Sequence, residues 1–488
     1  MQMRCNIAYK ARVIASIFAG SVFLTGCASF SLTEAPTRVE PQAQVAADVA
    51  PPPDWVVPVP DALPTTDWVR AFPDPILIEL VDEALRKNTT IGATYAQLDA
   101  AIASERISRA DRLPSIVGSA GLSRTEQANE FIPDSTGISS ALNASWEPDF
   151  WNRISDGINA AEIESEASAS DIASARLSIT GQVAQSWFSL IEAQLLVDLS
   201  VSDIETQERA LRLTQRRFEA GLTDSSDVRL ARTALAQSQA LESMRKQALS
   251  AFSRQLEILL TRYPESAIQA AKDLPELPPL TGAGAPSYIL TQRPDLIAAE
   301  RRLAAQGLQV DLAKKALLPS LSLTSAGSAN GGGFESFFDF DALVANLASN
   351  LTAPIFQGGR LRGNIQIQEA VLKQQMQSYI NTVLSAYLDV ENALEAETRL
   401  AVSEAALRVA AEEALKAEQR LELRYLEGLV PILQLLDAQT RRLAAEGQLI
   451  SARADRLQNR VSLHVALGGG AYGDIPPDAL PAFLREQG

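Results

Sequence analysis

Two long stretches of this 488-residue chain contain no proline, and they predict helices of unusual length. The first follows "EPDFWNR" (Glu147 to Arg153), after which the next proline is Pro264. The second follows "APIFQGGR" (Ala353 to Arg360), after which the next proline is Pro431. A helix from Arg153 to Glu219 would be roughly 100 Å long at about 1.5 Å per residue. No compact domain has room for such a helix, so the sequence predicts an elongated protomer.

The two halves of the chain repeat each other. "LPS" at Leu113 to Ser115 recurs at Leu318 to Ser320, and "RFEAGL" at Arg217 to Leu222 corresponds to "RYLEGL" at Arg424 to Leu429. "PDFWNR" likewise corresponds to "PIFQGGR". Three landmarks in the same order, each repeated about 205 to 207 residues later, indicate an internal duplication.

Proline-rich and glycine-rich stretches divide the chain into units. "PPP" at Pro51 to Pro53 lies in a segment that predicts an extended tether, and a second such stretch runs from Tyr263 to Pro286. Each repeat is expected to hold a helix, a β-hairpin, a very long helix and a returning helix. The predicted units are a signal peptide (1–26), a tether (27–75), a first repeat (76–262) with its hairpin at 115–149, a linker (263–286), a second repeat (287–467) with its hairpin at 320–356, and a C-terminal tail (468–488).

The first residues have the features of an export signal. "MQMRCNIAYKAR" is basic, and "VIASIFAGSVFLTGC" is apolar but too short to remain as a membrane span. The run ends in "LTGC" (Leu24 to Cys27), which resembles the bacterial lipobox, whose cysteine is lipidated. The alternative is an ordinary signal cleaved nearby, with Cys27 incidental. We expect lipidation of Cys27 and no disulfide, because Cys5 lies in the signal. Ala28 follows, which by resemblance to lipoprotein sorting points to the outer membrane.

Two pairs of short segments alternate between apolar and small polar residues, a pattern typical of β-strands. In the first pair, "VGSAGLSR" and "LNASWE" are joined by a loop that contains "TEQANEFIPDSTG". In the second pair, "SLSLTSAGS" and "ANLASNLTA" are joined by a loop that contains "GGGFESFFDFD". The sequence therefore predicts four strands in two hairpins, each with one apolar face and one small-polar face.

These strands favour a membrane role that is shared between chains. No segment after the signal has about 18 consecutive apolar residues, so a membrane crossing would have to use strands. Four strands are too few to close a barrel, since roughly eight is the smallest number that does. An open sheet would leave unpaired edges in lipid, so several chains would share one barrel. The alternative is a four-stranded sheet of a soluble domain.

Composition and motifs point away from several classes of function. The net charge is −16 and lysines and arginines are scattered, so no nucleic-acid interface is expected. Apolar residues make up 46% of the chain but aromatic residues only 6%, which favours closely packed helices. His464 is the one histidine, and "GGG" at Gly331 to Gly333 lacks the lysine of a phosphate loop, so we expect no metal, no cofactor and no enzymatic activity. The many carboxylates lie beside Arg and Lys on helix faces, the pattern of a solvated surface.

Taken together, these features resemble the outer membrane factor family of Gram-negative bacteria, the TolC-like exit ducts. The sequence is most similar to the lipoprotein branch that serves resistance–nodulation–division multidrug efflux systems, the NodT-type outer membrane efflux lipoproteins. The resemblance covers the whole mature chain. The local matches are "LTGC", "LTQRPDLIAAERRL", "LPSLSLTSAG", "LTAPIFQGGRLRG" and "GLVPILQLLDAQ".

The resemblance implies a mainly α-helical, internally duplicated protomer with a β-barrel part. Three protomers would form a twelve-stranded barrel in the outer membrane and a twelve-helix tunnel in the periplasm. The homotrimer would dock on a periplasmic adaptor and an inner-membrane resistance–nodulation–division transporter, and would passively conduct drugs or other small molecules to the outside. The alternatives are the same duct serving type I protein secretion, and a lipid-anchored coiled-coil scaffold.

The resemblance also implies a gate at the helix tips. Leu433 and Asp437 occupy the family's "LxLLDAQ" pattern, in which a leucine and an aspartate ring narrow the pore. The family often has an arginine three residues after the aspartate, where this chain has Thr440, followed by Arg441 and Arg442. The expected adaptor-contact residues lie in the two turns: Gly221, Leu222, Thr223, Ser225, Asp227, Gly428, Leu429 and Val430.

Two corners are expected where a strand becomes a tunnel helix. Proline would end the strand ladder, an aromatic residue would suit the membrane interface, and glycine would let the backbone turn. The corner residues are Pro354, Phe356, Gly358, Gly359 and Arg360 in the second repeat, and Pro148, Phe150 and Arg153 in the first.

Overall fold

A computed structural model describes residues 51–60, 67–126, 135–280, 282–331 and 344–469, with scattered further positions between 41 and 65. All of them belong to one compact unit, Arg38–Gly488. The expected signal peptide, Cys27, and parts of the expected tether and C-terminal tail lie outside the described residues.

The two halves carry the same order of elements. The first half contains α3 (Trp68–Ala71), α4 (Pro75–Lys87), α5 (Thr89–Ala110), β1 (Ser115–Thr125), β2 (Ser135–Trp146), α6 (Arg153–Glu219) and α7 (Ser225–Leu259). The second half contains the 3-10 turn η1 (Pro286–Tyr288), α8 (Ile289–Gln292), α9 (Pro294–Lys315), β3 (Ser320–Gly331), β4 (Val344–Thr352), α10 (Arg360–Leu426) and α11 (Ile432–Ala466).

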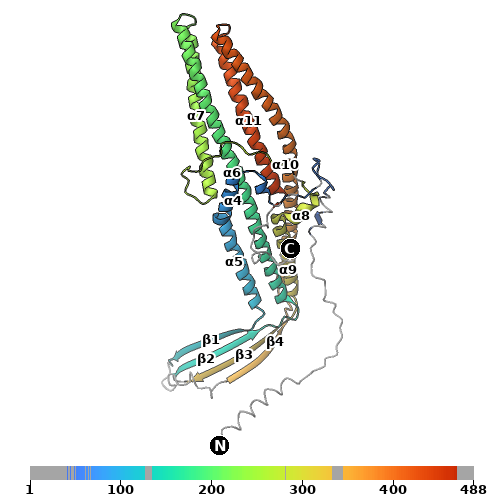
Figure 1. Cartoon of the computed structure of the whole chain (residues 1–488). Helices are drawn as coiled ribbons and strands as arrows, with labels where there is room; N and C mark the ends of the chain where they lie inside the picture. Colours follow the sequence, from blue (N-terminus) through green and yellow to red (C-terminus); the bar gives the residue numbers. More distant parts are fainter. Residues whose placement is uncertain are drawn as a thin grey trace. The chain divides into compact units, whose positions relative to one another are not determined.

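The long helices dominate the fold. α6 and α10 each contain 67 residues, and α7 and α11 return beside them as 35-residue helices. The resulting helical hairpins, α6–α7 and α10–α11, run away from the sheet (Figure 1). α5 packs on α6, and α9 packs between α6 and α10, so these shorter helices widen the part nearest the sheet.

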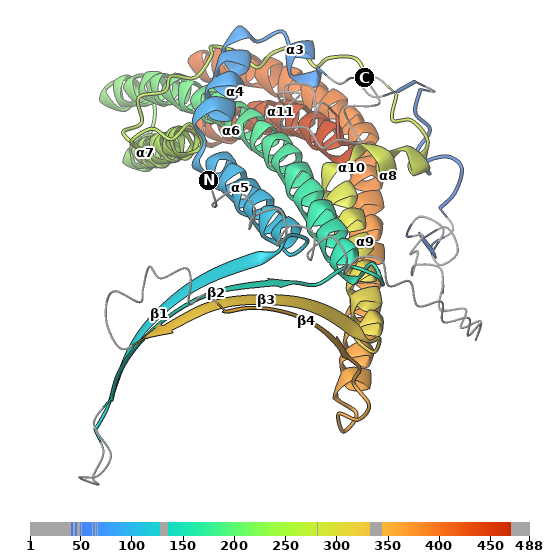
Figure 2. The same cartoon turned by 90° about the horizontal axis from the view of Figure 1, so that it is seen from below.

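The four strands form one antiparallel sheet in the order β1-β2-β3-β4, and the sheet is curved (Figure 2). The strands extend beyond the alternating segments from which they were predicted, because the ladder continues through Ser115↔Ser145 at one end and Thr125↔Ser135 at the other. The edges of β1 and β4 have no partner strand among the described residues. The predicted mainly helical fold with two hairpins is confirmed.

The first large core cluster joins the two repeats and the segment that precedes them. Trp187 of α6 is fully buried and packs with Phe72, just after α3, and with Val461 of α11. Its indole Nε1 donates a hydrogen bond of 2.7 Å to a carboxylate oxygen of Asp74. The same carboxylate accepts from the first backbone amides of α4, so one aspartate both caps a helix and satisfies the buried indole.

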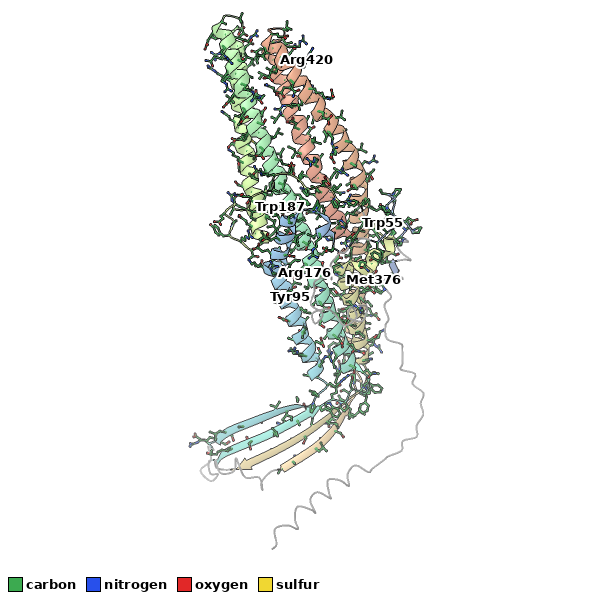
Figure 3. The ribbon with its side chains drawn as sticks, viewed as in Figure 1. Trp55, Tyr95, Arg176, Trp187, Met376 and Arg420 are labelled. Atoms are coloured by element: carbon green, nitrogen blue, oxygen red, sulfur yellow. The ribbon has the colours of Figure 1, made fainter. Side chains whose placement is uncertain are left out.

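The second cluster surrounds Tyr379 and Val383 of α10 and includes Leu463 of α11. Trp55, upstream of α3, belongs to it and lies at a similar height to Trp187 along the helices (Figure 3). Its indole Nε1 donates to the carbonyl of Gly284 at 2.8 Å. The segment before α3 is therefore held against the second repeat by a buried aromatic side chain.

His464 lies between these clusters with 4% of its surface exposed. Its ring stacks on Trp68 with a centroid separation of 5.5 Å and an interplanar angle of 8°. Burial, and to a lesser extent the charge of Arg460, lowers the pKa of His464 to about 4. The imidazole is therefore neutral near pH 7 and acts here as a packing group.

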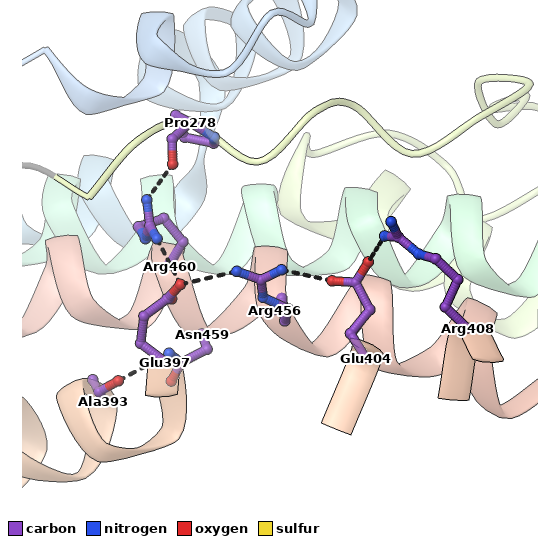
Figure 4. A network of polar contacts seen from close by, with 8 residues as sticks. All are labelled: Pro278, Ala393, Glu397, Glu404, Arg408, Arg456, Asn459 and Arg460. Carbon is purple, nitrogen blue, oxygen red and sulfur yellow. Dashed lines mark hydrogen bonds and ion pairs between the residues drawn. The ribbon is translucent and has the colours of Figure 1, made fainter. Parts of the chain in front are cut away.

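Buried ion pairs join α10 to α11 (Figure 4). Arg456 contacts Glu404 at 2.6 Å and Glu397 at 3.4 Å. Arg460, 2% exposed, contacts Glu397 at 2.8 Å and also donates to the carbonyl of Pro278 in the inter-repeat segment. These carboxylates had been expected on solvated surfaces. That expectation is wrong at these positions, because each carboxylate faces an arginine across the helix interface.

Candidate functional site

The helical hairpins end in two turns of the same design. α6 is followed by Gly221 with φ 72°, and α10 by Gly428 with φ 78°. The amide after each glycine donates back into the helix, from Leu222 to the carbonyl of Arg217 at 2.8 Å and from Leu429 to that of Arg424 at 2.9 Å. This is the Schellman pattern, in which the left-handed residue favours glycine.

The turn between α6 and α7 is ordered by short polar contacts. Asp224 caps α7 and accepts a hydrogen bond from the amide of Ser226 at 2.5 Å. Hydrogen bonds from the Ser226 hydroxyl and amide lower the pKa of Asp224. The Thr223 hydroxyl contacts the carboxylate of Asp227, and Ser225 is the first residue of α7. The expected contact residues of this turn therefore lie together at one helix start.

Leucine side chains are exposed at both turns. Leu222 is 68% exposed and Leu429 63%. Val430 is different, because it is buried against Ile432 and Tyr425. Its side chain supports the turn from inside, whereas the two leucines are available to a partner.

A buried contact joins the two hairpins near their tips. The guanidinium of Arg217 on α6 donates to the carbonyl of Tyr425 at 2.8 Å and lies 5.0 Å from the centre of its ring. The Tyr425 hydroxyl is 2.8 Å from that of Thr214, and Tyr425 is only 2% exposed. This contact was not anticipated from the sequence. The signal was present in the paired motifs, since Arg217 and Tyr425 belong to "RFEAGL" and "RYLEGL".

The expected gate residues lie one helical turn apart on α11. Leu433 is 62% exposed, and the Asp437 side chain is also exposed. The guanidinium of Arg441 donates to Asp437 at 2.8 Å. The Thr440 hydroxyl donates instead to the carbonyl of Leu436, so it leaves the carboxylate to Arg441. Both charged side chains of this pair are largely exposed, which makes it a weak contact that a partner or cation can replace.

The two strand-to-helix corners use different residues for a left-handed backbone. In the second repeat Gly358 and Gly359 have φ of 59° and 86°, and Arg360 begins α10. In the first repeat Asn152 has φ 56°, and Arg153 begins α6. Asparagine is one of the few residues that adopt this conformation readily.

An aromatic side chain is exposed at each corner. Phe356 is 88% exposed and Phe150 67%. The Arg153 guanidinium donates to Glu147 at 2.8 Å, which ties the start of α6 to the end of β2. The predicted prolines, Pro148 and Pro354, lie between strand and helix, where the ladder has ended.

The described part of the chain offers neither a cluster of metal ligands nor a helical membrane span. It contains no group of three or more His, Cys, Asp or Glu residues that could hold a metal ion. None of its helices is long and apolar enough to cross a membrane.

Comparison with known proteins explains this arrangement. The family model "Outer membrane efflux protein" matches residues 80–261 and 285–469, which are the two halves of the structure. The chain belongs to the outer membrane efflux protein family. As a member of that family, this efflux protein is a component of the outer membrane that acts in efflux. The predicted family, location and efflux role are thereby confirmed.

Relatives extend the match over nearly the whole efflux protein. It is 30% identical over 457 residues to the pyoverdine export outer membrane protein OpmQ of Pseudomonas putida, covering 88% of this chain and 94% of OpmQ. It is 25% identical over 463 residues to the probable outer membrane lipoprotein SilC of Salmonella typhimurium, covering 92% of this chain and 96% of SilC. The solved structure of the outer-membrane channel OprN superposes with a TM-score of 0.78 at 26% identity, covering 90% of this chain and 97% of OprN.

Proposed function

We propose that three copies of this efflux protein form the exit duct of a tripartite pump, which conducts small molecules from the periplasmic side to the outside. The duct is passive and carries out no reaction. A periplasmic adaptor docks on the helix tips, and an inner-membrane resistance–nodulation–division transporter supplies the energy.

The observation that carries this proposal is the pair of free sheet edges. Within the part of the chain that the structure describes, the order β1-β2-β3-β4 leaves β1 and β4 each with an unpaired edge. Unpaired backbone groups are costly in a bilayer, where no water satisfies them. Pairing β1 of one copy with β4 of the next removes every such edge, and three copies then supply twelve strands.

The helical hairpins carry matching stripes of exposed apolar residues. Leu230, Met244 and Ile258 lie along α7 at multiples of seven, and Val402 and Val409 lie along α10 at the same spacing. Seven-residue spacing places side chains on one face of a helix. Figure 1 shows α7 and α10 on opposite sides of the pair of hairpins. We therefore expect α7 of one copy to pack on α10 of the next.

The tips form the gate and the docking surface. Threefold symmetry brings three Leu433 and three Asp437 side chains together around the axis, where the carboxylates form a cation-binding ring. Leu222 and Leu429 offer apolar anchors to the adaptor, beside the polar residues Thr223, Ser225 and Asp227. Gly221 and Gly428 shape the two turns, and Val430 supports the second from inside.

Lipid attachment at Cys27 completes the proposal. Two or more acyl chains hold a protein stably at a bilayer, whereas one chain does so only marginally. The tether (27–75) would join this anchor to the two repeats (76–262 and 287–467). The corners at Phe150 and Phe356 would then lie at the periplasmic interface of the outer membrane.

The experiment is to purify the full-length protein in detergent, measure its mass by light scattering, and record its conductance in planar bilayers. A conducting particle of three protomers is expected. A non-conducting monomer would refute the duct and leave the scaffold. Deletion of the gene should raise susceptibility to apolar drugs. An unchanged drug profile with loss of a secreted protein would instead favour a secretion duct.

A further inference from the structure

We propose that the outer-membrane section of this duct has an uncharged wall and conducts solutes without selecting them by charge. The proposal rests on the proposed function, since it takes the four-stranded sheet as one third of that wall. It concerns one face of the sheet, formed by the odd-numbered residues of β1 and β2 and the even-numbered residues of β3 and β4, here called the small-polar face.

The strand register defines this face. Val117 pairs with Asn143, Asn143 with Ala326, and Ala326 in turn with Asn346, so one row crosses all four strands. Successive residues of a strand point to opposite faces. A row of odd-numbered residues on β1 and β2 therefore continues as even-numbered residues on β3 and β4.

The composition of the two faces differs sharply. Wherever the structure describes the side chains of the small-polar face, they are Ser, Thr, Asn, Gly, Ala or Val. The opposite face holds large apolar residues, including Leu122, Leu142, Leu347 and Leu351, all more than half exposed. The apolar face suits lipid, which assigns the small-polar face to the passage.

Charge is almost absent from the strands. The one charged residue in the four strands is Arg124, which lies on the apolar face at the loop end of β1 and contacts Glu126 at 3.1 Å. Charges resume where the helices begin, with Arg153–Glu147 at 2.8 Å and Lys315–Asp156 at 2.5 Å. Electrostatic selection therefore belongs to the helical section of the duct.

The side chains of the small-polar face are short as well as uncharged, so they project little from the sheet. A Cβ added at Gly121 would lie 3.0 Å from the Ser139 hydroxyl, and one added at Gly137 would lie 3.0 Å from that of Ser123. Each of these serines thus leans over the glycine that it faces on the neighbouring strand. The Ser123 hydroxyl donates to the Gly137 carbonyl at 3.3 Å. Such a surface offers hydrogen bonds to neutral, cationic and anionic solutes alike, and it leaves the passage wide.

The test uses a matched pair of neighbouring serines on opposite faces. Ser139→Cys places a thiol on the small-polar face, and Ser140→Cys places the same group on the apolar face. The sequence has 2 cysteines, Cys5 and Cys27, which the proposal assigns to the signal and the lipid anchor. Each purified variant is recorded in planar bilayers before and after reaction with a methanethiosulfonate that carries either a sulfonate or a trimethylammonium group.

We expect the two reagents to shift the permeability ratio by similar factors in opposite directions, and only in Ser139→Cys. Three unit charges about a Debye length from the axis change the local concentrations of K⁺ and Cl⁻ about twofold in opposite directions at about 0.1 M salt, so the K⁺/Cl⁻ permeability ratio should change about fourfold. The sulfonate should raise the ratio in Ser139→Cys and the trimethylammonium should lower it by a similar factor, while Ser140→Cys and the unmodified protein keep theirs.

Three outcomes would contradict the proposal. If Ser139→Cys conducts but responds to neither reagent, or if Ser140→Cys responds equally, the small-polar face does not line the passage. If one sign of charge shifts the ratio and the other does not, resident charge already lines this section. These results would overturn the uncharged wall alone. A protein that does not conduct at all would overturn the proposed function and this inference with it.

Discussion

The buried pair between Glu418 of α10 and Arg442 of α11 allows a quantitative test of how these two helices are held together. Both side chains are 7% exposed and in direct contact, and Arg442 also contacts Glu446 at 2.6 Å. The equivalent positions of the first repeat, about 207 residues earlier by the repeat offset, are Leu211 and Leu235. The first repeat therefore has a leucine at each of the two positions.

Removing one partner of the pair should lower the free energy of unfolding far more than removing both. Arg442→Leu leaves a carboxylate buried without its cation, which typically costs about 3 kcal/mol or more. Glu418→Leu should cost less, about 1 to 2 kcal/mol, because Arg442 keeps Glu446 as a partner. The double variant Glu418→Leu/Arg442→Leu places the two leucines of the first repeat at these positions, and its free energy of unfolding should equal that of the unmodified protein within about 1 kcal/mol or exceed it.

Amide hydrogen exchange of the intact protein, followed by mass spectrometry, reports the opening of the α10–α11 hairpin. A loss of about 3 kcal/mol corresponds to roughly 100-fold faster exchange. Lys416→Leu is the control, since its ion pair with Glu413 is exposed on both sides and should matter little. If the double variant exchanges as fast as Arg442→Leu, or if Arg442→Leu exchanges at the unmodified rate, the reasoning is wrong.

The pH dependence follows from the pKa of Glu418. Burial raises this pKa above its ordinary value, although Arg442 opposes the shift. In Arg442→Leu that opposing interaction is lost, so the pKa rises further. A carboxyl group with a raised pKa in the folded state favours folding when it is protonated. The stability that Arg442→Leu loses relative to the unmodified protein should therefore become smaller as the pH is lowered through this pKa. A loss of stability that becomes larger would contradict a buried, unpaired Glu418 carboxylate in the variant.

Three further predictions concern the tips and the core. Arg217→Ala removes the contact that holds Tyr425 to α6, so the conductance in planar bilayers should rise, whereas Arg216→Ala on the exposed side of the same helix should leave it unchanged. Asp437→Asn removes the carboxylate ring, so divalent cations added at the tip side should inhibit the current less than in the unmodified protein. Trp68→Ala opens a cavity beside His464 and should destabilise the core by about 3 kcal/mol or more, measured as a lowered midpoint of thermal unfolding.

The sequence predicted the fold well where the signal is local and repeated. The absence of proline from Arg153 to Glu219 sufficed for one very long helix, because an interior proline would have broken it. Alternation marked the strands but not their full length, since hydrogen bonding extends Ser135–Trp146 well upstream of the alternating "LNASWE". The Asp437–Arg441 pair is also a local feature, and the i,i+4 spacing of a helix places the two side chains together.

Contacts between distant helices were beyond the sequence. The pairing of Arg217 with Tyr425 depends on which faces of α6 and α10 meet. Phe218, which occupies the position of Tyr425 in the first repeat's motif, remains 44% exposed, so the motif alone does not predict burial. The prediction that the glutamates of α10 are solvated was wrong at some positions for the same reason. Glu404 and Glu418 have arginines nearby in the sequence, as solvated residues also do, and only tertiary packing buries them.

The internal duplication itself supplies the comparison that one sequence otherwise lacks. At the repeat offset of about 207 residues, Leu433 and Asp437 correspond to Ser226 and Leu230, so the residues that we propose as the gate occur in the second repeat alone. In the proposed trimer, the tip would therefore have three leucines and three aspartates at the gate rather than six of each. The second repeat also has the buried Glu418–Arg442 ion pair where the first repeat has two leucines, and an ion pair depends on geometry and protonation more than leucine side chains do. The contacts between α10 and α11 depend on the geometry and protonation of their ion pairs. We therefore expect the α10–α11 hairpin to be the one that moves when the tip opens. Faster amide exchange in α11 than in α7 would support this assignment, and equal protection of the two helices would refute it.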